Sequence, residues 1–319
     1  MQIRGKERYL TAFLRPFLAK RDLVFLWKKI EMKVTPTPQN NIQLALDIRR
    51  GQWLVSDAEA LLPIALDFLA HISPRLEVLD FEPMAYSEDG TSFGIGNDPD
   101  RKKKCVAVIP MRGTLTKYDT CFSIGTMTIA SQLIRSASDD NVVGVVLDVD
   151  SGGGACNSVP IMVEAIQKVK AAGKPIVSHC DFCASAAYWI ASQCDSIFVD
   201  NTLSAVGSIG VMTQIVDSSN LRSGEKIITV YAKESSDKNL AYRKALEGDI
   251  ELLQSEMSPI VQQFQNAVKE GRKNLQSDTP GVLSGAMFYA AKAREIGLID
   301  NIMTLDQVVE NVFVRAEYR

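Results

Sequence analysis

Residues 175–199 read PIVSHCDFCASAAYWIASQCDSIFV, and the fold class can be inferred from this segment. It begins with a short apolar run, continues at Ser185 into a helix-like segment of small residues, and ends in a second apolar run at 197–199. Short apolar strands that alternate with helices are typical of stacked α/β domains. The stretch therefore predicts one strand–helix–strand unit with a serine at the start of its helix.

The same alternation extends over the rest of the chain. We expect further strands at 106–110 and 142–149, and further helices at 127–137, 158–171, 249–272 and 286–296. Residues 1–100 are expected to form a mostly helical N-terminal region and linker, with helices at 8–31 and from residue 56, and residues 101–319 to form the functional domain. The predicted fold class is α/β.

Ser185 is the first candidate functional residue. A strand that leads into a serine at a helix N-terminus exposes the hydroxyl and places backbone N–H groups near it, which favours a nucleophile. The structural alternative is an ordinary helix start whose small neighbours allow close packing. The local sequence by itself leaves both interpretations open.

A serine nucleophile needs a base, and the chain has only two histidines, His71 and His179. His71 lies in a distant apolar helical run, and His179 lies on the incoming strand, where we expect a packing role. A Ser-His-Asp triad is therefore poorly supported. The remaining type of base is a lysine, which accepts a proton only when neutral, and burial favours that form.

Four motifs in order then resemble one family. They are the strand and glycine run at 145–154 (VVLDVDSGGG), the serine segment with Tyr188 and Ala191, the turn at 207–212 (GSIGVM), and the segment at 290–300 (AAKAREIGLID). Together they resemble the signal peptide peptidase A family of serine proteases, peptidase family S49, including its prophage-encoded relatives. The sequence departs from the usual family motifs at two places, and small residues stand at both. Gly152 replaces a proline, and Ala186-Ala187 replace a glycine pair.

The resemblance implies a Clp-protease/crotonase-like fold of stacked ββα units and a Ser/Lys peptidase without a cofactor. Ser185 would be the nucleophile and Lys238, which follows it by 53 positions, the base. Gly153 and Ala186 would donate N–H groups to the oxyanion, and Ser208 would orient the lysine. Three nearby lysines are rivals of Lys238: Lys226, Lys233 and Lys244.

The implied partners are a peptide or protein substrate and further copies of the chain, in a homo-oligomer with enclosed active sites. Phage head-protein maturation is the expected setting, with signal-peptide or general peptide degradation as an alternative. Two other classes stay open: a crotonase-type acyl-CoA enzyme, which needs no serine at 185, and an inactive assembly or scaffold protein.

Composition limits the remaining classes. The chain has 319 residues, of which 46% are hydrophobic and 23% charged, and a net charge of −3, which gives no reason to expect nucleic-acid binding. No apolar run is long enough for a transmembrane anchor, and the N-terminus lacks a secretory signal, so we expect a cytoplasmic protein. Cys180 and Cys183 have metal-like spacing, but no second Cys/His pair accompanies them, so no metal is expected.

Overall fold

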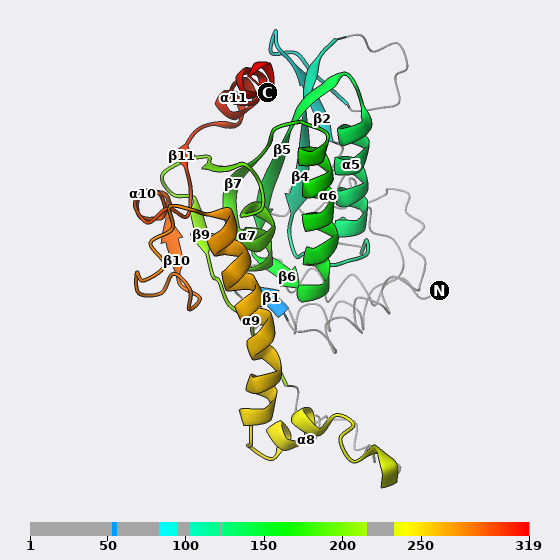
Figure 1. Ribbon diagram of the computed structural model, residues 1–319, viewed down its shortest axis with the longest axis vertical. Coiled ribbons are helices and arrows are strands. Elements are labelled where there is room, and N and C mark those ends of the chain that lie inside the picture. The colour runs from blue at the N-terminus through cyan, green and yellow to red at the C-terminus, as the bar shows by residue number, and fades with distance from the viewer. Residues whose placement is uncertain (1–52, 56–82, 95–102, 121–122, 216–232, 319) are drawn as a thin grey trace, which may run out of the picture.

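The computed structural model describes residues 53–55, 83–94, 103–120, 123–215 and 233–318. These residues form an α/β fold, as the sequence predicts, with one large mixed sheet covered by helices on both faces (Figure 1). The helices expected at 8–31 and from residue 56, like His71, lie outside the described residues.

The centre of the large sheet is parallel and buried. Its path runs β10-β9-β7-β5-β4-β2-β3, and β8 pairs with β7 and with β11. The parallel strands are β4 (Cys105–Arg112), β5 (Val142–Ser151), β7 (Ile176–Ala184), β8 (Ser196–Val199), β9 (Ala205–Gly207) and β11 (Asn301–Ile302). Near-continuous apolar runs such as VVGVVLDV in β5 suit strands that are covered on both faces.

Helices cover the two faces of this sheet unequally. One face packs against α5 (Thr126–Ser138), α6 (Val159–Ala171) and α7 (Ala186–Ala191), and the main core lies there. The other face packs against α11 (Leu305–Glu317), through a smaller cluster that includes Val146, Val177 and Val308. Successive residues of a strand point to opposite faces, so Val146 and Val177 belong to the second cluster while Leu147 and Ile176 belong to the first.

Several strands were not predicted. The hairpin β2 (Met84–Ser87) and β3 (Ser92–Gly94) joins the sheet through antiparallel pairing of β2 with β4. Strand β1 (Trp53–Val55) pairs with β6 (Gly153–Ala155) in a separate two-stranded sheet. These strands have three or four residues, too few for a period of two to be recognised, and β1 also pairs with a segment about a hundred residues away.

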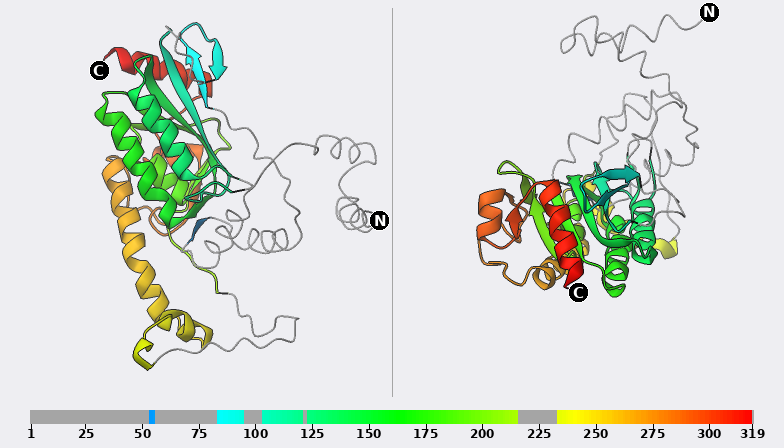
Figure 2. Two further views of the ribbon diagram at one scale, coloured as in Figure 1. Left: turned by 90° about the vertical axis from the view of Figure 1, so that its right-hand side faces the viewer. Right: turned by 90° about the horizontal axis from the view of Figure 1, so that it is seen from above.

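The C-terminal part contains one wrong prediction and one missed helix. The helix expected at 286–296 is instead β10 (Met287–Tyr289), which pairs with β9, followed by the short α10 (Ala290–Glu295). Helix α11 was missed, although Thr304 and Gln307 form a capping box that marks its start. The long helix α9 (Glu251–Gly271) was expected, and it projects from the sheet with α8 (Leu240–Leu246) at its distal end (Figure 2).

Candidate active site

Ser185 lies in the sharp turn between β7 and α7. Its φ of 55° and ψ of −121° are unusual for a residue that is not glycine. Such strain costs about 1–3 kcal/mol and persists where the surroundings enforce it, often at functional sites. Here the Ser185 N–H donates to the Gly207 carbonyl oxygen at 2.9 Å, which fixes the turn against the end of β9.

The Ser185 hydroxyl is buried but weakly held. The residue is 1% exposed, and its Oγ donates to the Gly210 carbonyl oxygen at 3.5 Å, a long distance for an O–H···O bond. A strand-to-helix turn that carries a strained serine has the geometry of a nucleophile elbow. The expected position of the serine at the helix start is therefore confirmed, but its hydroxyl is buried rather than exposed as expected, because the surrounding segments cover the turn. Its chemical role stays a prediction.

Ala186 is the first residue of α7 and is fully buried. The first N–H groups of a helix have no acceptor within that helix, so the Ala186 N–H is available to a ligand. Helix α7 has six residues, fewer than the expected segment 185–193. Any stabilisation of an anion here would come from the N–H itself rather than from a long helix dipole.

Gly153, the other expected oxyanion donor, is the first residue of β6, against which α7 packs. Its φ of 97° favours glycine. Its N–H donates to the Ser151 Oγ at 3.1 Å, and the Ser151 hydroxyl donates to the Gly113 carbonyl oxygen at 2.6 Å. This N–H therefore already has an intramolecular acceptor, with which a substrate oxygen would compete.

Ser208 lies next to the residue that anchors Ser185. It is half-buried, has a φ of 52°, and donates its N–H to the Ala286 carbonyl oxygen at 2.9 Å. Pairing of Gly207 with Met287 fixes the same turn from the other side. The structure thus brings Ser208 to the neighbourhood of Ser185 through β9, but it does not bring Lys238 there.

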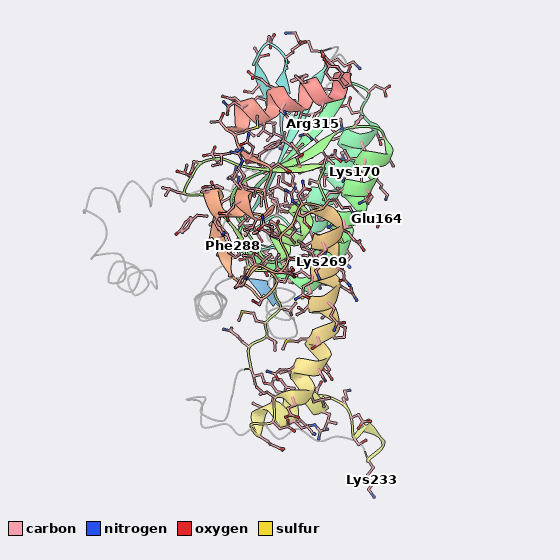
Figure 3. All side chains as sticks on the ribbon, turned by 60° about the vertical axis from the view of Figure 1, so that its left-hand side comes forward. Glu164, Lys170, Lys233, Lys269, Phe288 and Arg315 are labelled. Atoms are coloured by element: carbon pink, nitrogen blue, oxygen red, sulfur yellow. The ribbon has the colours of Figure 1, made fainter. Side chains whose placement is uncertain are left out.

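Lys238 lies far from Ser185 within one chain. It is exposed, in the turn that joins the 3-10 helix Lys233–Ser235 to α8, at the end of α9 distant from α7 (Figure 1). Figure 3 shows Lys233 at this distal tip, whereas Phe288 of β10 lies in the body of the domain. Lys244 lies on α8 itself and pairs with Asp249 at 3.4 Å. Lys226 lies outside the described residues.

His179 does not serve Ser185. Its Nδ1 lies 3.0 Å from Asp148 Oδ1 and its Nε2 lies 3.4 Å from Asp200 Oδ1. Asp148 also pairs with Arg112. His179 alternates with Ile176 and Cys180 of the main core and shares the α11 face with Val177, which is the face opposite α7. Instead of the packing role expected for it, His179 belongs to a polar cluster with Asp148 and Asp200 behind the sheet.

Helix α7 is held by Tyr188, which the sequence analysis named only as part of the serine motif, and by Trp189, which it did not single out. The Tyr188 hydroxyl donates to the Leu298 carbonyl oxygen at 2.7 Å, and the Trp189 ring stacks on Phe264 of α9 with centroids 4.8 Å apart. Arg272, also buried, pairs with Asp300 at 2.7 Å. The motif at 290–300 was the available signal, because it contains both Leu298 and Asp300.

The described residues contain no group of three or more His, Cys, Asp or Glu placed to hold a metal ion. Cys180 and Cys183 are both buried in the main core. Burial is also the main reason why the pKa of the Cys180 thiol is raised. Among the helices that the structure describes, none combines the length and apolar character that crossing a membrane requires.

One family of known proteins matches the part of the chain that contains most of these segments. Residues 168–318, which include the Ser185 turn, β9 and the motif at 290–300, match the model of peptidase family S49. The C-terminal part of the chain is therefore similar to this family. The resemblance drawn from the four motifs is therefore confirmed, and the mixed α/β sheet is consistent with the Clp-protease/crotonase-like fold expected of an S49 member.

Similar proteins include two bacterial peptidases and one phage protein. Protease 4 of Haemophilus influenzae is 31% identical over 64% of this chain and 34% of its own length, and Protease 4 of Salmonella typhi is 27% identical over 64% and 33%. The head-tail preconnector protein GP5 of Enterobacteria phage P21 is 26% identical over 74% of this chain and 49% of its own length. The chain thus spans about a third of Protease 4 and about half of the phage protein.

Proposed function

We propose that this protein is a serine endopeptidase that cleaves peptide bonds with a Ser/Lys dyad. The observation that carries the proposal is the strained turn at Ser185, which leads directly into the first residue of α7, Ala186, in a helix that packs against the glycine strand β6. Strain of this kind is retained at a cost in stability, and a nucleophile elbow accounts for it.

The reaction follows from the positions of these groups. Ser185 Oγ attacks the substrate carbonyl carbon and gives its proton to the Nζ of Lys238, while the N–H groups of Ala186 and Gly153 receive the developing oxyanion. The carbon–nitrogen bond then breaks, and the lysine passes the proton to the leaving amine. Water, deprotonated by the same lysine, releases the acyl group from Ser185.

The distance of Lys238 from Ser185 favours a dyad shared between two copies of the chain. Helix α9 holds the lysine-bearing turn away from its own domain, and the same tip exposes Leu246 and Ile250 by 48% and 49%. Exposed apolar side chains gathered at a projecting tip favour burial against a partner. When a neighbouring copy covers the tip, the Lys238 of the first copy would lie beside the Ser185 of the neighbouring copy. Ser208 of that neighbouring copy would then orient the lysine.

Covalent labelling tests the nucleophile. A phosphonofluoridate probe should modify the parent protein at Ser185 alone, as read by peptide mapping, because only an activated serine attacks this phosphorus centre. Ser185→Ala should remain unlabelled and should not hydrolyse peptides. Ser192→Ala is the matched control, since Ser192 is a buried serine at the other end of α7, and it should be labelled as the parent is.

The labelling result also distinguishes a serine peptidase from the two other classes of protein left open by the sequence. A folded parent protein that takes up no label would favour a scaffold or a crotonase-type acyl-CoA enzyme, because neither uses Ser185 as a nucleophile. Labelling of Ser185→Ala at the parental level would contradict the proposed role of this serine.

Proteins of a phage head are the substrate class that we propose. The similarity to a phage head-tail preconnector protein over 74% of this chain supports this choice over signal-peptide or general peptide degradation. Genes for portal and major capsid proteins beside the gene for this chain would agree with the proposal. Cleavage of the neighbouring capsid protein by the purified parent, and not by Ser185→Ala, would test it directly.

A further inference from the structure

The glycine strand β6 is paired by a segment from the N-terminal part of the same chain. Strand β1 runs antiparallel to β6, with Trp53 opposite Ala155, Leu54 opposite Gly154 and Val55 opposite Gly153. Figures 1 and 2 show β1 at the end of the domain where β6 lies, outside the large sheet. In this structure, β1 therefore lies along the strand that carries the proposed oxyanion donor.

The backbone of β6 shows which edge β1 covers. On one edge the Gly153 carbonyl oxygen accepts from the Leu115 N–H at 2.9 Å, and the Ala155 N–H donates to the Leu115 carbonyl oxygen at 2.9 Å. Because backbone polar groups alternate along a strand, the N–H and carbonyl of Gly154 face the other edge. That edge would present unpaired groups to an extended peptide, and β1 pairs with it.

The direction of β1 matches that of a substrate. From Trp53 to Val55 the segment runs from Ala155 toward Gly153, so its carboxyl end arrives at the proposed oxyanion donor. A substrate whose reacting carbonyl must reach Gly153 would place the residues before its scissile bond along the same path. The side chains of β6 are hydrogen atoms and one methyl group, so the backbone of an incoming strand can approach closely.

We infer that Trp53–Val55 is an internal strand ligand that occupies the peptide-binding edge of β6, and that an extended peptide substrate must displace it. The inference rests on the proposed function, because it identifies this edge as the substrate's place. Strand addition supplies affinity through main-chain hydrogen bonds and so lets one edge accept different sequences. Joined covalently to the domain, β1 competes at a high effective concentration and lowers the apparent affinity for any free peptide.

One substitution removes the proposed pairing and a neighbouring one leaves it intact. Leu54 lies opposite Gly154, so its N–H faces β6, whereas the N–H of Val55 faces away. Leu54→Pro removes a donor from the ladder and Val55→Pro does not, although both introduce the same ring. Both proteins are made in the Ser185→Ala background, so that bound peptide is not consumed.

The probe is a fluorescent peptide of residues 51–57, GQWLVSD. Fluorescence anisotropy should show the Leu54→Pro protein binding it at least about tenfold more tightly than the Ser185→Ala parent, because the competing segment has been removed. The Val55→Pro protein should resemble the parent. Hydrogen exchange should show the Gly154 amide protected in the parent and in Val55→Pro, and exposed in Leu54→Pro without peptide.

Two results would overturn the inference. One is equal peptide binding, or none, by all three proteins, and the other is protection of Gly154 that appears only at high protein concentration, since β1 would then come from another copy. These readouts need no catalysis. Peptide binding as expected, together with no hydrolysis or labelling by a protein with Ser185 intact, would therefore refute the peptidase proposal while leaving the strand ligand in place.

Discussion

At the scale of single residues, the candidate active site differs from the rest of the described chain more by its backbone angles than by its side-chain chemistry. Ser185 and Ser208 both have positive φ angles, near 55° and 52°, and Gly153 has a φ of 97°. Conformations of this kind are enforced by neighbours, here by Gly207 and Ala286, whose carbonyl oxygens accept from Ser185 and Ser208. Substitutions at these positions should therefore affect catalysis more than their side-chain volumes suggest.

Replacing Gly153 tests the oxyanion strand. Gly153→Ala should lower kcat/KM for a peptide about a hundredfold, because a side chain at this φ would displace the N–H that we propose as an oxyanion donor. Gly90→Ala is the control, since Gly90 also has a positive φ, 79°, but lies in the β2–β3 hairpin with open space around it. Steady-state kinetics should show parental turnover in Gly90→Ala, and parental turnover in Gly153→Ala would mean that the donor lies elsewhere.

Thiols whose pKa is raised by burial should resist alkylation in the folded protein, and Cys194, which is buried, and Cys156, which is half-buried, are two of them. Burial raises the pKa of both Cys156 and Cys194 to about 12. The reactive thiolate is therefore a fraction of about 10⁻⁴ of each thiol at pH 8. Mass spectrometry after iodoacetamide treatment at pH 8 should find both residues unmodified in the native state and modified in guanidinium. Rapid native modification of Cys194 would show that α7 opens readily.

At the scale of elements, the short helix α7 depends on its neighbours. It has six residues, too few to be stable by itself, and its fixed points are the Tyr188 bond to Leu298 and the stack of Trp189 on Phe264. The close approach of α9 adds a further constraint, because a Cβ at Gly271 would lie 2.0 Å from the Ser192 carbonyl oxygen. The position of Ser185 thus depends on C-terminal segments.

Tyr188→Phe tests this dependence. Burial raises the pKa of the Tyr188 phenol, so the hydroxyl stays a protonated donor at every pH relevant to function. Its loss leaves the buried Leu298 carbonyl without this donor and should lower the free energy of unfolding by about 1–3 kcal/mol. Chemical denaturation should show no comparable loss for Tyr289→Phe, since Tyr289 is 66% exposed, and equal stability of the two variants would contradict the anchoring role.

At the scale of the whole molecule, the proposed catalytic groups are divided between the body and the projecting tip. The turn before α7, β6 and the end of β9 lie in the body, whereas the turn before α8, which carries Lys238, lies at the distal end of α9 (Figure 1). Closed symmetric assemblies allow one copy to supply what its neighbour lacks. A division of this kind would make catalysis depend on assembly.

Mixing two inactive variants tests the shared dyad. Ser185→Ala and Lys238→Met should each be inactive, and subunit exchange at equal amounts should restore about a quarter of the parental rate, because a site needs an intact serine from one copy and an intact lysine from the other. The control is a mixture of Lys244→Met with Ser185→Ala. Lys244→Met should be active alone, and the activity of this mixture should be lower only in proportion to its inactive Ser185→Ala copies. No recovery in the first mixture would place serine and base in the same chain or exclude Lys238 as the base.

The resemblance to peptidase family S49, the α/β alternation and the position of the serine turn could all be predicted from the sequence alone. These features are local, since strand and helix periods, glycine runs and short motifs are all contained within a few consecutive residues. The expected helix at 127–137 and strand at 142–149 accordingly lie within α5 and β5. The same local signals would have indicated α11, had the capping box at Thr304 been used.

Only the tertiary structure decided which distant groups meet. It turned residues 287–289 into a strand because β9 offers backbone partners to them, and it placed His179 with Asp148 on the face opposite α7. It also paired Trp53–Val55 with β6 and held Lys238 away from Ser185. A three-residue strand or an exposed turn acquires its place from hydrogen bonds and packing contributed by other segments, and no pattern within the segment itself encodes those partners.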